Sequence, residues 1–254
     1  MRLAATAFAF ALVLARPAPS LADDKDTRVY ELRTYHVNPG KLDALNARFK
    51  DHTVKLFEKH GMTNGGYFTP IDNAKDTRLI YFMIYPSKEA RDRSWKAFLA
   101  DPDWKKVYAE TTKDGKLVNK VDAFFLRTTD YSPPVKLETK DDRVFELRTY
   151  TATKGNLGNL DDRFKDHTMK LFDKHGMTNI VYWYLLPGSK DADRTLVYLL
   201  AHKSQAGAKQ SFAAFAKDPD WVAAKKASEV KGKGSLTEKV VSVFMKPTDY
   251  SPLK

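Results

Sequence analysis

The chain contains 254 residues, with 43 Lys and Arg against 32 Asp and Glu, a formal net charge of +11 at pH 7, and no cysteine. A content of 43% hydrophobic and 12% aromatic residues is typical of a folded protein with one large or two ordinary domains. The absence of cysteine excludes a disulfide scaffold, a thiol nucleophile and cysteine-ligated metal sites. No apolar run reaches the roughly 18 residues of a membrane-spanning helix, so no transmembrane span is expected.

Residues 1–22 have the layout of a secretory signal peptide. Arg2 supplies a basic start, residues 3–15 form an apolar run, and Ser20 and Ala22 place small side chains before the expected cleavage point. As a helix, that run would span only about 20 Å, which is too short for a bilayer. We therefore expect cleavage near Ala22 and a secreted or periplasmic mature protein.

The remainder of the chain contains one unit twice. The segment RVYELRTY at 28–35 returns as RVFELRTY at 143–150, and 26 of 40 positions are identical between 28–67 and 143–182. The later motifs DPDW and TDYSP also occur twice. A period above one hundred residues indicates two copies of a domain, because solenoid repeats have periods of only about 20–50 residues.

The expected boundaries follow from this duplication and from composition. Repeat 1 is expected at 27–131 and repeat 2 at 143–252. The intervening residues 132–142 are rich in proline and charge, which is typical of a linker.

Repeat 1 has an alternating pattern over 29–36, which predicts a strand. A helix is expected from Asn38 as N-cap, with Pro39 at its first position, to Gly61 as its left-handed cap. The following elements are expected to be strands over 64–70 and 78–85, a helix capped by Ser87 and ended at 101–102, a short helix over 104–111 and a strand over 117–126. The main order βαββαβ is typical of a ferredoxin-like fold.

A four-stranded sheet with its helices on one face leaves the other face bare, and a second such sheet can cover it. A duplicated chain can supply both sheets. We therefore predict an α+β fold in which two ferredoxin-like βαββαβ repeats pack within one chain as a pseudo-dimer, either face to face or as a closed barrel.

The segments VYELRTY, FKDHTVKLFEKHGM, DPDW and TDYSP resemble the NIPSNAP family, and the resemblance covers nearly all of the mature chain twice. It implies the dimeric α+β barrel group, which includes small cofactor-free monooxygenases and haem enzymes. Named NIPSNAP proteins are mitochondrial and linked to vesicle traffic and mitophagy signalling, with no settled catalytic activity. The predicted export departs from that mitochondrial setting, so the resemblance implies a fold more strongly than a function.

The first strand carries the sharpest candidate site. Glu31, Arg33 and Tyr35 share one face, with Glu31 and Arg33 about 6.6 Å apart along the strand. If Tyr30 and Leu32 pack under the helices, the charged face lines the barrel lumen, where buried charges must be paired. Two interpretations remain open: a polar ligand pocket with Glu31 as a general base, or structural pairing that fixes the strand register. The same face recurs in repeat 2 as Glu146, Arg148 and Tyr150.

Further candidates are less specific. His52 lies at the margin of the apolar helix stripe, about 12 Å along the axis from His60, so the two cannot share a metal ion. Tyr67 lies on the second strand and faces either the lumen or the core. The full set of candidate ligand-binding residues is Glu31, Arg33, Tyr35, His52, Tyr67, Glu146, Arg148, Tyr150, His167 and Tyr182. No catalytic residue is assigned, and neither a metal nor a cofactor is expected.

We expect an exported protein that binds a small molecule or a protein partner through the barrel. The alternatives are a cofactor-independent monooxygenase or isomerase, with Glu31 and Glu146 or His52 and His167 as acid/base groups, and a purely structural interaction module. A cavity of about 300 Å³ or more favours a ligand site, whereas a filled lumen favours the interaction module. If only one repeat functions, the pair Gly65 and Gly66 makes repeat 1 the more open.

The basic residues are scattered without interleaved aromatic residues, so no nucleic-acid partner is expected, and at most a weak attraction to anionic surfaces. The sequence is compatible with a homo-oligomer and leaves open whether the protein is an enzyme.

Overall fold

The computed structural model describes residues 26–72, 77–139 and 143–254. The predicted signal peptide lies outside the described residues. Repeat 1 comprises β1 (Val29–Val37), α1 (Leu42–Arg48), the π-helical turn η1 (Phe49–Thr53), α2 (Val54–Lys59), β2 (Thr63–Pro70), β3 (Arg78–Tyr85), α3 (Lys88–Ala100), α4 (Pro102–Thr111) and β4 (Val118–Thr128). Repeat 2 comprises β5 (Val144–Ala152), α5 (Leu157–Arg163), η2 (Phe164–Thr168), α6 (Met169–Lys174), β6 (Thr178–Leu185), β7 (Thr195–His202), α7 (Gln205–Lys217), α8 (Pro219–Lys231) and β8 (Thr237–Pro247).

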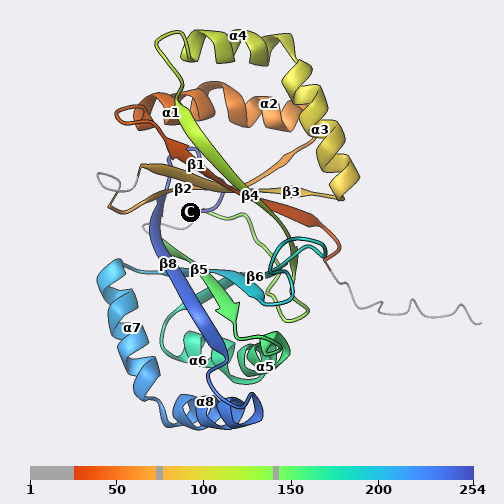
Figure 1. Ribbon diagram of the computed structural model, residues 1–254. Helices are drawn as coiled ribbons and strands as arrows, with labels where there is room; N and C mark the ends of the chain where they lie inside the picture. The colour runs from red at the N-terminus through yellow and green to blue at the C-terminus, as the bar shows by residue number, and fades with distance from the viewer. Residues whose placement is uncertain (1–25, 73–76, 140–142) are drawn as a thin grey trace, which may run out of the picture.

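The strands form one closed antiparallel barrel in the order β1-β3-β2-β8-β5-β7-β6-β4. The two repeats are joined at both seams by their last strands. Leu126 to Thr128 of β4 pair with β6, and Met245 to Pro247 of β8 pair with β2. Helices α1 to α4 cover one half from outside and α5 to α8 cover the other, with the strands between them (Figure 1). The predicted intramolecular α+β barrel is therefore confirmed.

The interior of the barrel is filled by apolar side chains from both repeats. Tyr30 and Leu32 of β1 point into it, and the ring of Tyr30 lies 5.6 Å from that of Trp183. The remaining space is about 10 Å³, which is close to the minimum for one water molecule. The expectation that Glu31 and Arg33 line the lumen is therefore wrong: the apolar face of β1 fills the lumen, and the charged face lies under the helices.

Gly65 and Gly66 serve this interior packing. A Cβ atom at Gly65 would lie 2.2 Å from the ring of Phe82 and 2.7 Å from its backbone oxygen. Glycine at this position therefore makes room for Phe82. The expectation that the two glycines open a site in repeat 1 is wrong, because the Phe82 ring occupies the space that they leave.

The first helix of repeat 1 differs from its prediction in two ways. It begins at Leu42 after a turn in which Gly40 has φ +72°, and the Asn38 side chain donates to the carbonyl oxygen of Lys116 at 2.6 Å instead of capping the helix. It is also interrupted by the π-helical turn η1, which the periodicity did not predict. Single π-helical turns within α-helices occur frequently at functional sites.

The hydroxyl of a threonine completes each π-helical turn. Thr53 donates to the carbonyl oxygen of Arg48 at 3.1 Å, and Thr168 donates to that of Arg163 at 3.0 Å. These bonds span five residues and satisfy carbonyl groups that the wider turn loosens. Arg48 and Arg163 thus hold equivalent places, each at the end of the α-helical segment that precedes its π-helical turn.

Candidate functional site

Glu31 anchors a buried ionic cluster between β1 and α3. Its side chain is fully buried, with one carboxylate oxygen 2.5 Å from Nη1 of Arg33. Arg91 donates to both of its oxygens, at 2.8 Å through Nε and 2.6 Å through Nη2. Tyr85 and Trp95 donate to it as well, each at 3.2 Å. Burial raises the pKa of Glu31, but the hydrogen bonds and charges of the two arginines outweigh it and lower the pKa below its ordinary value.

Beside this cluster lies a cavity of about 460 Å³ between the strands β1 and β4 and the helices of repeat 1. We call it the repeat 1 pocket. Its volume is within the range of about 300–1,000 Å³ that is typical of small-molecule sites. Three arginines reach it, Arg33, Arg48 and Arg91. Its aromatic walls are Tyr35, Phe49, Phe57, Trp95, Phe98, Trp104 and Tyr108.

The aromatic walls hold two of the arginines in place. The guanidinium carbons of Arg33 and Arg91 lie 4.4 Å and 5.0 Å from the ring centre of Trp95, within the range of cation–π contacts. Both arginines also share the carboxylate of Glu31. Their positions in the repeat 1 pocket are therefore fixed before any ligand arrives.

Arg48 has a different environment. Its side chain is buried, with 5% of the residue exposed, and its guanidinium carbon lies 5.5 Å from the ring centre of Trp104 and 5.6 Å from that of Tyr108. Its hydrogen-bond partner is the hydroxyl of Thr111 at 3.5 Å, and its buried Nε has none. Burial lowers the pKa of Arg48. A buried cation with so few partners is available to an incoming acceptor.

The structure brings together some of the predicted site residues of repeat 1 and separates others. Arg33 and Tyr35 line the repeat 1 pocket, and Glu31 lies directly behind it. His52 is exposed on η1, outside the pocket. Tyr67 is buried in the core between sheet and helices, where its hydroxyl donates to Asn64. The acid/base role considered for His52 therefore receives no support from its position.

Several residues of the pocket were not among the predicted candidates: Arg48, Arg91, Trp95, Trp104 and Tyr108. Arg48 carried a signal in the sequence. It follows Leu45 by three residues on the apolar stripe of the helix, and repeat 2 has an arginine at the same place. A cation that interrupts an apolar stripe in both copies indicates a buried functional or structural role.

Repeat 2 arranges the equivalent cluster differently. Glu146 pairs with Arg148 at 2.5 Å and with the buried His202 at 3.0 Å, and it accepts a hydrogen bond from Ser242 at 2.5 Å. Burial raises the pKa of Glu146, but these partners lower it below its ordinary value. Ala208 stands where repeat 1 has Arg91. Repeat 2 therefore lacks the second arginine of the cluster.

The other predicted residues of repeat 2 follow the pattern of repeat 1. Tyr150 accepts a hydrogen bond from Arg148 at 3.0 Å, Tyr182 is buried in the core between sheet and helices, and His167 is exposed. The position of His167, like that of His52, gives no support to an acid/base role.

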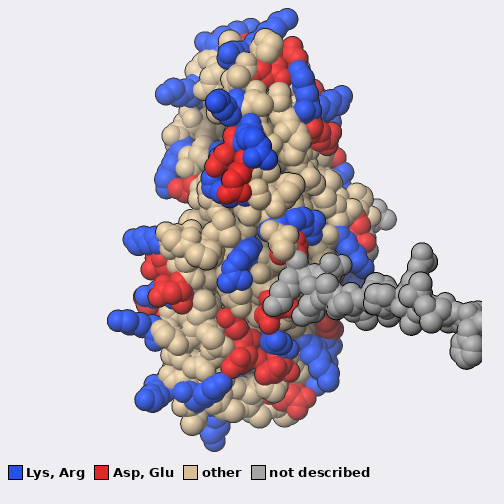
Figure 2. All heavy atoms as spheres, turned by 90° about the vertical axis from the view of Figure 1, so that its right-hand side faces the viewer, with Lys and Arg blue, Asp and Glu red and all other residues tan. Residues whose placement is uncertain are grey.

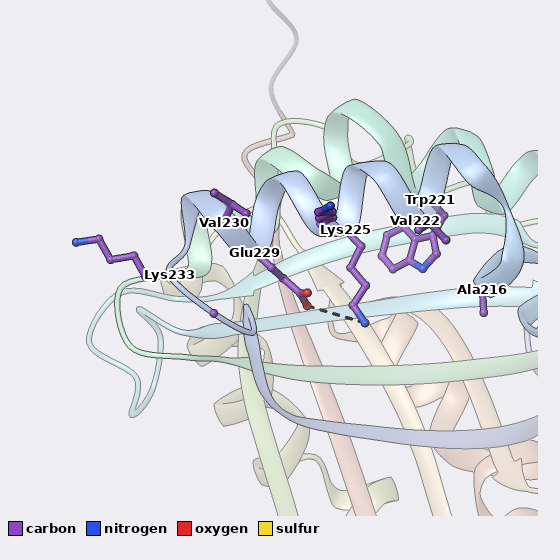
Figure 3. A pocket seen from close by; sticks show the side chains of 9 residues that line it. Ala216, Trp221, Val222, Lys225, Glu229, Val230 and Lys233 are labelled. Atoms are coloured by element: carbon purple, nitrogen blue, oxygen red, sulfur yellow. Dashed lines mark ion pairs between the residues drawn. The ribbon is translucent and has the colours of Figure 1, made fainter.

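A second cavity, of about 690 Å³, lies along α8. We call it the α8 groove. Trp221, Lys225 and Glu229 extend from the same side of the helix into it, and Lys225 pairs with Glu229 at 4.0 Å (Figure 3). Trp221 and Lys225 occupy the places that Trp104 and Tyr108 hold in repeat 1. The same region of the two repeats has therefore diverged in both shape and charge.

Among the described residues, no group of three His, Asp or Glu side chains is placed to hold a metal ion. No helix in the described ranges combines the length and apolar character of a membrane span. On the face seen in Figure 2, basic and acidic side chains are interspersed, and no continuous basic stripe crosses it.

Two solved structures resemble the protein over most of its length, and a third resembles it over less than half. A candidate monooxygenase from Lactobacillus acidophilus matches with a TM-score of 0.54 and 10% identity over 87% of this chain and 94% of its own. An anthrone oxidase-like protein matches with a TM-score of 0.55 and 12% identity over 92% and 97%. A NIPSNAP-like domain protein from Burkholderia xenovorans covers 43% of this chain and 92% of its own, with 21% identity and a TM-score of 0.38. At these identities the first two similarities show the fold alone.

Sequence comparison assigns the family. No curated protein matches the chain. The NIPSNAP family profile matches both repeats, over residues 30–133 and 145–252. The chain therefore belongs to the NIPSNAP family, with two copies of its domain.

Proposed function

We propose that this protein binds a small organic molecule in the repeat 1 pocket. The observation that carries the proposal is the contrast between the two interior spaces. The barrel lumen retains about 10 Å³, whereas the repeat 1 pocket has about 460 Å³ and combines aromatic walls with three arginines, of which Arg48 is buried. An apolar pocket with a few fixed polar groups is the usual form of a small-molecule site. The proposed site therefore lies outside the lumen, under the helices of repeat 1.

The chemistry of the pocket favours binding over proton transfer. Glu31 lies behind the pocket, and its oxygens already accept hydrogen bonds from Arg33, Arg91 and Trp95. A carboxylate with a lowered pKa and several donors is a weak general base. Arginines and aromatic rings are groups that hold and orient a ligand.

The test is to obstruct the pocket and compare binding with a matched change in repeat 2. Leu99 on α3 lines the pocket and is 54% exposed, so a tryptophan there can enter the opening without disturbing the core. We expect ligand-observed NMR with a mixed library of neutral, acidic and basic compounds to detect binders. Their signals should disappear with Leu99→Trp and persist with Ala216→Trp, its counterpart in α7. Equal binding by both variants, or an absence of binders, would refute the proposal.

We also propose that the protein functions after export from the cytoplasm. The support is the basic, apolar and small-residue order of residues 1–22. Expression of the full chain in a Gram-negative host, followed by fractionation and mass spectrometry, tests this. The expected product is a periplasmic chain that begins at Asp23, and an intact cytoplasmic chain would contradict the proposal.

A further inference from the structure

We propose that the ligand of the repeat 1 pocket is an organic anion whose charged group pairs with Arg48. This inference rests on the proposed function and adds the chemical class of the ligand and the residue that selects it. The arginines at the pocket are unequally neutralised. Arg33 and Arg91 share the carboxylate of Glu31. Within the described part of the chain, Arg48 has no ion pair.

A buried guanidinium without a counter-charge is unfavourable, because burial removes its hydration without supplying an acceptor. Arg48 is 5% exposed, its Nε is unpartnered, and its neighbours are the neutral rings of Trp104 and Tyr108. It also lines the cavity directly. A carboxylate or sulfonate in that cavity would provide the missing acceptor in the geometry that guanidinium groups prefer.

Repeat 2 differs in the charge that lies near the equivalent arginine, although the buried Nε of that arginine is also without a partner. Arg163 is the counterpart of Arg48, lying 5.1 Å from the ring centre of Trp221 and 3.4 Å from the hydroxyl of Ser228. Burial lowers the pKa of Arg163, and the negative charge of Glu229 opposes that shift. Figure 3 shows Glu229 on the side of α8 that carries Trp221. Repeat 1 has Thr112 at the position of Glu229, so Arg48 lacks this neighbouring negative charge.

The remaining walls indicate the body of the ligand. Beyond Arg48, the pocket offers the rings of Trp95, Trp104 and Tyr108 and the side chain of Leu99. Aromatic rings favour flat apolar groups, which stack or meet them edge to face. The geometry therefore fits a small aromatic acid, held by its anionic group at Arg48 and by its ring between the aromatic walls.

Two dyes that share an apolar body separate charge recognition from simple burial. 8-Anilinonaphthalene-1-sulfonate carries one sulfonate, and N-phenyl-1-naphthylamine is the same skeleton without it. We expect fluorescence titration to give at least a tenfold loss of sulfonate affinity with Thr112→Glu, because the new carboxylate adds a negative charge near Arg48 that offsets its attraction for the sulfonate. The affinity for the neutral dye should change less than twofold.

Three further variants complete the design. Thr112→Gln has the shape of the glutamate without its charge and should retain sulfonate binding. Arg48→Leu should lose it, and Arg163→Leu should retain it, with melting temperatures measured for each to identify unfolded protein. Because Thr112→Glu keeps Arg48, the test remains decisive even if Arg48→Leu does not fold.

The outcomes distinguish the two proposals. One outcome is that Leu99→Trp abolishes binding of the neutral dye, the sulfonate binds no more tightly than the neutral dye, and Thr112→Glu leaves the sulfonate affinity unchanged. The pocket then binds small molecules, but the assignment of an anionic ligand is wrong. If Thr112→Gln reduces sulfonate binding as much as Thr112→Glu, the effect is steric and the role of Arg48 is overturned. If Leu99→Trp affects neither dye, both proposals fail.

Discussion

Arg91 on α3 holds both carboxylate oxygens of Glu31 on β1, with Nε 2.8 Å from one and Nη2 2.6 Å from the other. This contact joins the helix layer to the sheet at a point where Glu31 is fully buried. The pocket beside it depends on that junction, because Arg91 and Trp95 both form its wall from the same helix. The pair is thus a structural support for the site.

The first prediction concerns this junction. Glu31→Gln leaves Arg33 and Arg91 without their shared counter-charge, and breaking a buried ion pair from one side costs about 3–5 kcal/mol. We expect the free energy of unfolding in urea to fall by roughly that amount. Asp92→Asn is the control, since Asp92 pairs with Arg91 at the surface, where ion pairs contribute about 0–1 kcal/mol. A loss below about 1 kcal/mol for Glu31→Gln would contradict the structural role.

The second prediction concerns pH. Asp161 on α5 accepts a hydrogen bond from Tyr131 at 2.8 Å, and burial raises its pKa from 3.8 to about 6, although the hydrogen bonds from Tyr131 and Tyr184 oppose the rise. Between these two values the folded state holds a proton that the unfolded state has released. The protonated Asp161 therefore makes its full contribution to the free energy of unfolding below about pH 4, and this contribution is lost as the pH rises through 6.

Asp161→Asn tests this dependence, because repeat 1 already has Asn46 at the same place, accepting from Tyr250 at 2.8 Å. We expect the urea midpoints of the variant and the parent to lie close together near pH 4 and to separate by pH 7, with the variant the more stable. The measurement is a series of denaturation curves across that range. A separation that does not change with pH would show that Asp161 does not titrate as described.

The third prediction concerns the π-helical turn that precedes the pocket. Thr53 is 1% exposed and its hydroxyl satisfies the carbonyl oxygen of Arg48. Thr53→Val keeps the shape and removes the donor, so we expect a loss of about 1–3 kcal/mol in unfolding free energy. Thr168→Val should behave alike in repeat 2. Thr53→Ser retains the hydroxyl, and if it destabilises more than valine, packing rather than the hydrogen bond holds the turn.

The fourth prediction concerns the filled lumen. Gly65→Ala would place a methyl group 2.7 Å from the backbone oxygen of Phe82, so the strand must shift. Overpacking of this kind typically costs about 1–3 kcal/mol. Gly158→Ala is a control of opposite sign, because its Cβ meets nothing within 4 Å and alanine favours the helix by up to about 1 kcal/mol. Equal melting temperatures for the two variants would argue against a tightly packed interior.

The architecture was predictable because the information for it is local and repeated. Ser87 caps α3 by accepting from the backbone of Ala90 at 3.2 Å, as its sequence position predicts. The alternation of β1 also appears as expected. The duplication indicates that the second repeat covers the bare sheet face of the first, and the two sheets form a closed barrel.

The orientation of β1 was not predictable from alternation alone. Period-two patterning separates Tyr30 and Leu32 from Glu31 and Arg33, but both faces of this strand are covered, one by the lumen and one by helices. The choice depends on partners from distant sequence. Arg91 lies sixty residues beyond Glu31, and it neutralises the carboxylate only when the charged face is turned toward α3.

The site itself was visible only in part. Arg33 and Tyr35 were among the predicted residues and line the pocket, whereas Arg48 was missed although it interrupts the apolar stripe of its helix. The aromatic rings that surround Arg48 belong to Trp104 and Tyr108 on α4, more than fifty residues later in the chain, and only the fold brings them together. The exchange of Thr112 for Glu229 is visible when the two repeats are aligned, but its relation to the two equivalent arginines follows only from the structure.

Strands β4 and β8 each start within their own half and finish beside a strand of the other. In a barrel assembled from two identical subunits, any substitution necessarily appears twice. In a single chain the two repeats can differ, so repeat 2 has Ala208 at the position of Arg91 and Lys225 at the position of Tyr108. One repeat can then acquire a specialised site while the other preserves the shared architecture.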